Sequence, residues 1–151
     1  MRELKLLTRK ELKELKSIVK QQWDADFNFD YAVLKNKDND IFIANKELFN
    51  IDFSKLRIDS FGMYFGQLKN NQLRLSVEGA QLIGPYAKKN IIELSFREMR
   101  DFFHGLDVDK EKTADGFVIL KHNNDFIGCS RFKENKLLNF IPKARRVKAA
   151  D

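Results

Sequence analysis

Four cationic side chains gather near the C-terminal end of the sequence, where Lys143, Arg145, Arg146 and Lys148 follow Pro142. No acidic residue lies among them. Pro142 ends the preceding apolar segment because proline cannot donate a hydrogen bond within a sheet. Cations held on or beside a small rigid sheet are well placed to bind a phosphate backbone. This basic arm therefore predicts nucleic-acid binding, with Lys143, Arg145 and Arg146 as its phosphate contacts.

Nucleophilic and metal chemistry find little support in the residue pattern. Cys129 is the only cysteine, and it lies within an apolar segment beside Ile127 and Arg131, so we expect a core position. His104 and His122 are the only histidines, and neither neighbours another ligand at a metal-binding spacing. We expect no metal, no cofactor and no enzymatic activity.

Composition predicts a folded protein of ordinary domain size. The 151 residues are 43% hydrophobic and 33% charged, and no stretch of eighteen apolar residues occurs. The lone cysteine and the N-terminal segment, which does not resemble a signal peptide, favour a cytoplasmic location without membrane attachment. Charge is uneven: residues 1–21 carry a net +4, and residues 116–151 a net +5. If both ends meet on one face, that face is basic.

The N-terminal third predicts a helix and a hairpin. Thr8 and Glu11 form a capping-box pattern at the start of a helix over residues 8–22. Residues 31–35 and 41–44 read as two strands with a polar turn between them. The helix also carries a stripe of cations, which is either a solvated face or part of a binding surface: Arg9, Lys13, Lys16 and Lys20.

The remaining two thirds predict strands and short capped helices. Strands over 56–68 and 73–75 surround an Asn-Asn turn, and Ser76 begins a helix that runs to Tyr86. A short strand over 91–94 precedes a second helix capped by Ser95. Residues 107–115 read as a polar loop, and a three-stranded meander follows from Gly116. Tyr64 and Tyr86 are candidates for stacking on bases.

Four segments together resemble a known family: residues 61–85, 91–105, 116–132 and 139–146. They are similar to the PUA-type RNA-binding module of tRNA and rRNA cytosine-C5 methyltransferases, here as a stand-alone archaeal-type protein. The ending Pro142, Lys143, Arg145 and Arg146 matches the Pro-Lys-x-x-Arg ending of that family. The chain departs from the methyltransferases because it has no glycine-rich cofactor loop and no Pro-Cys pair.

The resemblance implies an α+β fold with two units and a tail. A small pre-PUA α/β unit spans residues 1–57, a PUA-like β pseudobarrel with short helices spans 58–147, and 148–151 form the tail. It also implies further RNA contacts. Arg74, Lys88 and Lys89 would flank the first barrel helix, Gly79 would let an RNA backbone approach it, and Arg131 and Lys133 would add secondary contacts.

The function expected from these features is non-catalytic binding of structured rRNA or tRNA. Such a protein would assist RNA modification or ribosome assembly, with a modification or assembly factor acting in trans. The alternative is a protein-interaction adaptor in a ribosome-biogenesis or RNA-modification complex, whose basic patches meet an acidic partner. The helix over residues 8–22 supports that alternative because its exposed flank offers a docking surface.

Overall fold

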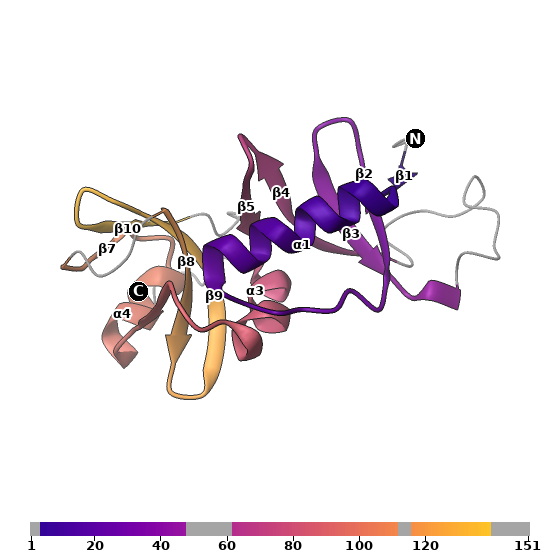
Figure 1. Cartoon of the computed structure of the whole chain (residues 1–151). Coiled ribbons are helices and arrows are strands. Elements are labelled where there is room, and N and C mark those ends of the chain that lie inside the picture. Colours follow the sequence, from indigo (N-terminus) through magenta and orange to yellow (C-terminus); the bar gives the residue numbers. More distant parts are fainter. Residues whose placement is uncertain (1–3, 48–61, 112–115, 140–151) are drawn as a thin grey trace.

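The computed structural model describes residues 4–47, 62–111 and 116–139. These residues form an α+β fold with two five-stranded sheets, three α-helices and a 3-10 turn (Figure 1). The strands of the first sheet come from the N-terminal half of the chain, and those of the second sheet come from the C-terminal half (Figure 1). None of the helices in these ranges is long and apolar enough to cross a membrane.

The first sheet is a meander in chain order, and each of its strands pairs antiparallel with the next. Asn70 and Asn71 both adopt positive φ angles of 54° and 58°, as a two-residue hairpin turn requires. Both predicted hairpins are thereby confirmed for the described residues, and residues 56–61 of the predicted strand over 56–68 lie outside them. The strands are β1 (Lys5–Leu6), β2 (Ala32–Lys35), β3 (Asp40–Ala44), β4 (Gly62–Lys69) and β5 (Gln72–Leu75).

Helix α1 (Arg9–Trp23) covers one face of the first sheet and confirms the N-terminal prediction. The capping box is present, because the Thr8 hydroxyl accepts from the Glu11 N–H while the Glu11 carboxylate accepts from the Thr8 N–H. Leu15, Val19 and Trp23 are buried against the sheet. Apolar burial at this helical spacing fixes which side of α1 remains in solvent.

Helix α3 (Val77–Ile83) begins at the predicted cap, Ser76, and continues into the 3-10 turn η3 (Gly84–Tyr86). Gly79 lies in its first turn and is buried against β4. A Cβ atom there would lie 2.2 Å from the carbonyl oxygen of Phe65. The close approach of helix to strand therefore requires glycine at this position.

The second sheet contains the predicted C-terminal meander. Its strand order is β6 (Ile91–Glu93), β8 (Gly116–His122), β9 (Asp125–Lys133), β10 (Lys136–Leu138) and β7 (Val108–Asp109). Helix α4 (Phe96–Phe103) starts at Ser95, with its own capping box, and buries Phe102 against this sheet. Strand β7 corrects the prediction of an unbroken loop over residues 107–115, because Val108 pairs with Leu137.

The main core joins the two sheets. It combines residues of α1, such as Leu15 and Trp23, with Phe65 of β4 and with Ile119 and Cys129 of the second sheet. The first sheet also crosses the predicted unit boundary at residues 57 and 58, because β3 and β4 are hydrogen-bonded neighbours. The division into units stays a prediction, but strands on both sides of it share one sheet.

Candidate nucleic-acid interface

The exposed end of the second sheet brings two predicted contacts, Arg131 and Lys133, onto one face. Register places Phe117 and Leu138 directly opposite Arg131, so these three residues form a row across β8, β9 and β10. The next row places Lys136 opposite Lys133. Side chains two residues apart along a strand share a face, so the two rows are neighbours. The result is a surface of three exposed cations beside an aromatic ring.

The Arg131 guanidinium carbon lies 5.9 Å from the centre of the Phe117 ring, which places the cation over the aromatic face. This contact holds the guanidinium while leaving its N–H donors for other partners. Among the described residues, Arg131, Lys133 and Lys136 form no salt bridge. The acid facing this surface from β7 is Asp109, opposite Lys136.

The direct pairing of Lys133 with Lys136 is unfavourable in the free protein. Like charges opposite one another on adjacent strands repel by a fraction of 1 kcal/mol. A phosphate bound between the two ammonium groups would remove this repulsion and replace it with two attractive contacts. The arrangement therefore favours an anionic ligand at this place on the sheet.

Arg74 lies at the junction of the two sheets. Its guanidinium donates to the Gln67 side-chain oxygen at 3.4 Å and also contacts the Tyr64 hydroxyl. The positive charge of Arg74 acts on the Cys129 thiol and opposes the rise in its pKa. Cys129 lies two residues before Arg131 on β9. Burial, followed by the nearby Asp40 carboxylate, raises the pKa of the Tyr64 phenol above its ordinary value. Arg74 is thus partly engaged within the protein, on the β9 side of the first sheet.

Lys88 and Lys89 lie elsewhere, at the C-terminal end of α1. Both backbone N–H groups donate to the Trp23 carbonyl, at 2.8 and 3.3 Å. The Lys88 ammonium lies 3.9 Å from a carboxylate oxygen of Asp26. Both lysines also help to lower the pKa of Asp24, after the larger contribution of Lys20. Acidic neighbours therefore reduce the net positive charge at this end of the helix.

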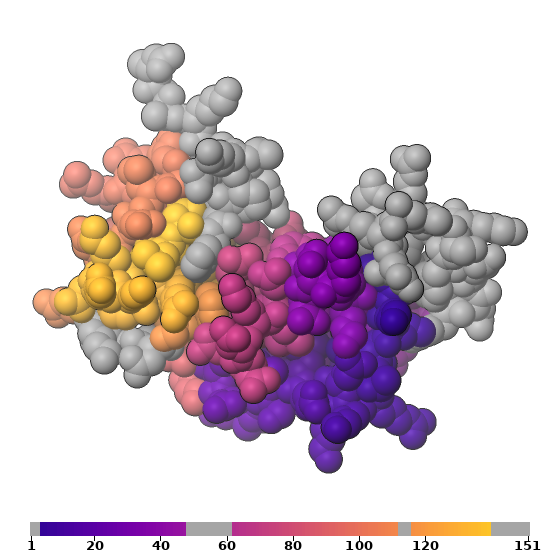
Figure 2. All heavy atoms as spheres, turned by 90° about the horizontal axis from the view of Figure 1, so that it is seen from above, coloured from indigo at the N-terminus to yellow at the C-terminus, as the bar shows by residue number. Residues whose placement is uncertain are grey.

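The cationic stripe on α1 is exposed, as predicted, but its C-terminal end is paired. Lys20 forms salt bridges with Asp24 at 2.8 Å and Asp26 at 3.1 Å. Figure 2 shows the yellow surface of β9 and β10 at the opposite end of the molecule from the indigo start of the chain. The start of α1 and the second-sheet cations therefore do not form one continuous basic face.

Gly79 corrects one predicted contact. Its N–H donates to the Ser76 hydroxyl at 2.9 Å, and its Cα is packed against the Phe65 carbonyl, so it is buried. No RNA backbone reaches this position without separating α3 from β4. Gly79 serves helix packing and leaves the set of candidate contacts.

The three contacts predicted on the basic arm, Lys143, Arg145 and Arg146, lie outside the described residues. The structure does define where the chain leaves the sheet. The Asn139 side-chain amide donates to the carbonyls of Phe102 at 2.6 Å and Leu106 at 3.1 Å. Asn139 directly follows Leu138, which lies opposite Arg131. The chain thus enters the arm from a fixed point beside the first row of the surface.

Two members of this surface, Phe117 and Lys136, were not among the predicted contacts. A two-residue turn at Glu134 and Asn135 places Lys136 opposite Lys133, so counting back from that turn would have found Lys136. Counting back from the turn at Asn123 would have placed Phe117 opposite Ser130. The register shift between Leu120 and Lys121 moves Phe117 opposite Arg131, and no local sequence signal reveals it.

Cys129 is buried, as predicted. Burial raises the pKa of its thiol to about 12. The thiolate fraction at pH 8 is then roughly one in ten thousand, because each pH unit below the pKa lowers it tenfold. We expect a maleimide to react with the native protein at least about 100-fold more slowly than with the urea-unfolded chain, with the native rate rising as pH rises. Rapid native reaction at pH 8 would contradict this placement.

We further expect Cys129→Ser to lower the free energy of unfolding by about 1 kcal/mol and to leave RNA affinity unchanged. The buried serine hydroxyl needs a hydrogen-bond partner more strongly than the thiol does. Urea unfolding and an RNA titration measure the two quantities. Loss of a covalent activity in a folded Cys129→Ser protein would show that the residue is a nucleophile.

The C-terminal part of the chain is similar to a known family. Residues 89–147 match the family model of the methyltransferase RsmF PUA domain. The chain is 30% identical over 90 residues to ribosomal RNA small subunit methyltransferase F of Aeromonas hydrophila, an alignment that covers 59% of this chain and 19% of the relative. It is 25% identical over 108 residues to the enzyme of that name from Vibrio cholerae, covering 71% of this chain and 23% of the relative.

The resemblance to the PUA module of cytosine-C5 methyltransferases is therefore confirmed. The archaeal-type origin is not supported, because the relatives found are bacterial. The chain spans about a fifth of the length of these relatives.

Proposed function

We propose that this protein is a non-catalytic RNA-binding protein that contacts structured rRNA or tRNA through a basic face. The face consists of Arg131, Lys133 and Lys136 on the second sheet together with the basic arm that follows Pro142. The observation that carries this proposal is the pair of rows on β8, β9 and β10, which hold three exposed cations without salt bridges among the described residues, one of them over an aromatic ring. The names of the relatives, which describe methylation of ribosomal RNA, support RNA as the ligand.

The fold supports a PUA-like pseudobarrel preceded by a pre-PUA unit. We assign the second sheet and α3 to the pseudobarrel, and the family match at residues 89–147 supports this assignment. We assign helix α1 and strands β1 to β3 to the pre-PUA unit, whose core residues pack with Ile119 and Cys129 of the second sheet. In this arrangement the first unit stiffens the second and leaves the far end of the second sheet open to RNA.

The proposed role is binding without chemistry. The lone cysteine has a thiol pKa of about 12, which is too high for a nucleophile at neutral pH. A protein of this kind would assist RNA modification or ribosome assembly in the cytoplasm by holding RNA for a factor acting in trans. The residue pattern offers no catalytic constellation but gathers positive charge on one face. This combination favours binding over enzymatic activity.

Titration with a ribosomal RNA or tRNA fragment over a range of salt concentrations tests the proposal. Each neutralised phosphate contributes roughly −0.9 to the slope of log affinity against log salt. Six contacts, three on the sheet and three on the arm, would give a slope of about −5. An affinity that does not change between low and moderate salt would reject phosphate binding and favour the protein-interaction adaptor.

A further inference from the structure

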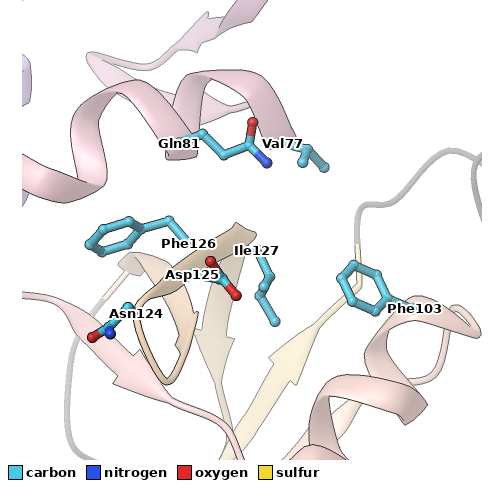
Figure 3. Close-up of a pocket in the computed structure, with 7 residues that line it drawn as sticks. All are labelled: Val77, Gln81, Phe103, Asn124, Asp125, Phe126 and Ile127. Carbon is cyan, nitrogen blue, oxygen red and sulfur yellow. The ribbon is translucent and has the colours of Figure 1, made fainter.

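A pocket of about 510 Å³ lies at the other end of β9, between α3 and α4. Here β9 has β8 on one side, while its pairing with β10 begins only at Arg131. Figure 3 shows Gln81 and Val77 of α3 above the opening, the start of β9 below it and Phe103 of α4 at one side. The lining residues are Val77, Gln81, Phe103, Asn124, Asp125, Phe126 and Ile127.

Polar groups with unused hydrogen-bonding capacity meet at this pocket. The Gln81 amide and the Asp125 carboxylate face each other across the opening (Figure 3). Neither side chain forms a hydrogen bond or salt bridge with another described residue, and the same holds for Asn124 at the rim. The adjacent Asn123, in contrast, donates its N–H to Glu93 at 2.8 Å. An apolar pocket with a few converging, unpaired polar groups is typical of a ligand site.

The walls of the pocket are held in place by packing. The Phe126 ring lies against Gly84, where an added Cβ atom would come within 2.3 Å of the ring. On the same ring, the Lys121 ammonium lies 5.5 Å from the centroid. Phe103 is half-buried and contacts Phe102, whose side chain is fully buried. The aromatic walls of the pocket are therefore formed before any ligand binds.

The chemistry of the pocket selects a base and disfavours a phosphate within it. The Asp125 carboxylate accepts hydrogen bonds and repels anions, so the ligand must present N–H donors. Guanine offers two adjacent donors on its Watson–Crick edge, the ring N1–H and the exocyclic amino group, which match the two oxygens of a carboxylate. The other RNA bases present one donor group there. The Lys121 ammonium beside the pocket can hold the phosphate of the same nucleotide.

We propose that this pocket binds an unpaired guanine base of the RNA, with Asp125 accepting from N1–H and the amino group and Gln81 hydrogen-bonding the base from the opposite side. The proposal rests on RNA binding by the basic face and adds a base preference to it. Unpaired bases splayed from loops are the usual target of sequence-specific RNA recognition. The Asp125–guanine pair would discriminate against other bases by roughly 5- to 150-fold, the range for a bidentate contact.

Binding of hairpin RNAs that differ only in one unpaired loop nucleotide tests the pocket. Wild-type protein should bind the guanine hairpin at least about 5-fold more tightly than the adenine hairpin, with the inosine hairpin between them because it lacks the amino group. Asp125→Asn should remove most of this preference. Asp38→Asn, which deletes an equal charge from an exposed turn between β2 and β3, should retain it. Both side chains are exposed, so both variants should fold, as urea unfolding would verify.

Equal, salt-dependent binding of all three hairpins by the wild type would overturn the pocket and leave the basic face standing. The pocket would also be overturned if Asp125→Asn weakened binding of all three hairpins equally. Absence of binding to any RNA would overturn both proposals. Guanosine monophosphate, added as a competitor, separates a free nucleotide from a base in RNA. Displacement of the RNA by guanosine monophosphate at equal concentration would assign the pocket to the free nucleotide and overturn the RNA assignment.

Discussion

Arg145→Ala combined with Arg146→Ala is expected to weaken RNA affinity by roughly 10- to 30-fold at 0.15 M salt. This range follows from two lost phosphate contacts, each contributing about −0.7 to −0.9 to the salt slope, and a counterion effect that vanishes near 1 M salt. Guanidinium groups bind phosphate through two parallel hydrogen bonds, which an ammonium group does not form.

The matched control is Lys13→Ala combined with Lys16→Ala, two exposed cations of the α1 stripe. We expect a loss below about threefold and an almost unchanged salt slope, because these side chains are mobile and lie on another surface. Both double variants should fold normally. Equal losses would mean that the site spans both ends of the molecule, and a loss from the lysine pair alone would place the binding face on α1.

Gly79→Ala is expected to lower the free energy of unfolding by about 2–4 kcal/mol, an effect at or above the usual range for an overpacked core. The new methyl group would lie 2.2 Å from the Phe65 carbonyl oxygen and 3.1 Å from a methyl carbon of Leu75. Backbone atoms of β4 cannot turn away as a side chain can, so α3 must move. Alanine's better helix propensity, worth about 1 kcal/mol, offsets only part of this cost.

Urea unfolding measures the free energy of unfolding of Gly79→Ala and of a control variant, Gln81→Ala. Gln81 is exposed two residues further along α3, so its change should alter stability by less than about 0.5 kcal/mol. Where Gly79→Ala remains folded, its affinity for an RNA without an unpaired guanine should stay within about twofold of wild type, because Gly79 lies inside the protein and away from the basic face. A stable Gly79→Ala protein that has lost affinity for such an RNA would restore the interpretation of Gly79 as an RNA contact.

Features encoded within a few residues were predictable from the sequence. The capping boxes at Thr8 and Ser95 marked both helix starts, because the partners of each cap lie three residues apart. The Asn-Asn turn at Asn70 and Asn71 marked its hairpin because asparagine tolerates positive φ. Arg131 and Lys133 lie on one face of β9 because side chains alternate along a strand, and their role as RNA contacts stays a prediction.

Features that depend on contacts distant in sequence were not predictable in the same way. Gly79 was interpreted as a ligand contact because nothing near it in the sequence reveals the Phe65 carbonyl against which it packs. Strand β7 is two residues long and forms only because Leu137 lies beside Val108. Asp26, which lies beside Lys88, is 62 positions away in the sequence, so local charge counts overstated the basicity around that lysine.

Backbone amide chemical shifts, followed by NMR while a ribosomal RNA fragment is added, test the proposed binding face most directly. We predict that the largest changes fall at Phe117, Arg131, Lys133 and Lys136 and on residues 143–146, and that they diminish as salt rises. Changes confined to α1, with β8, β9 and β10 unaffected at saturating RNA, would contradict the proposed face and place RNA on another surface of the molecule.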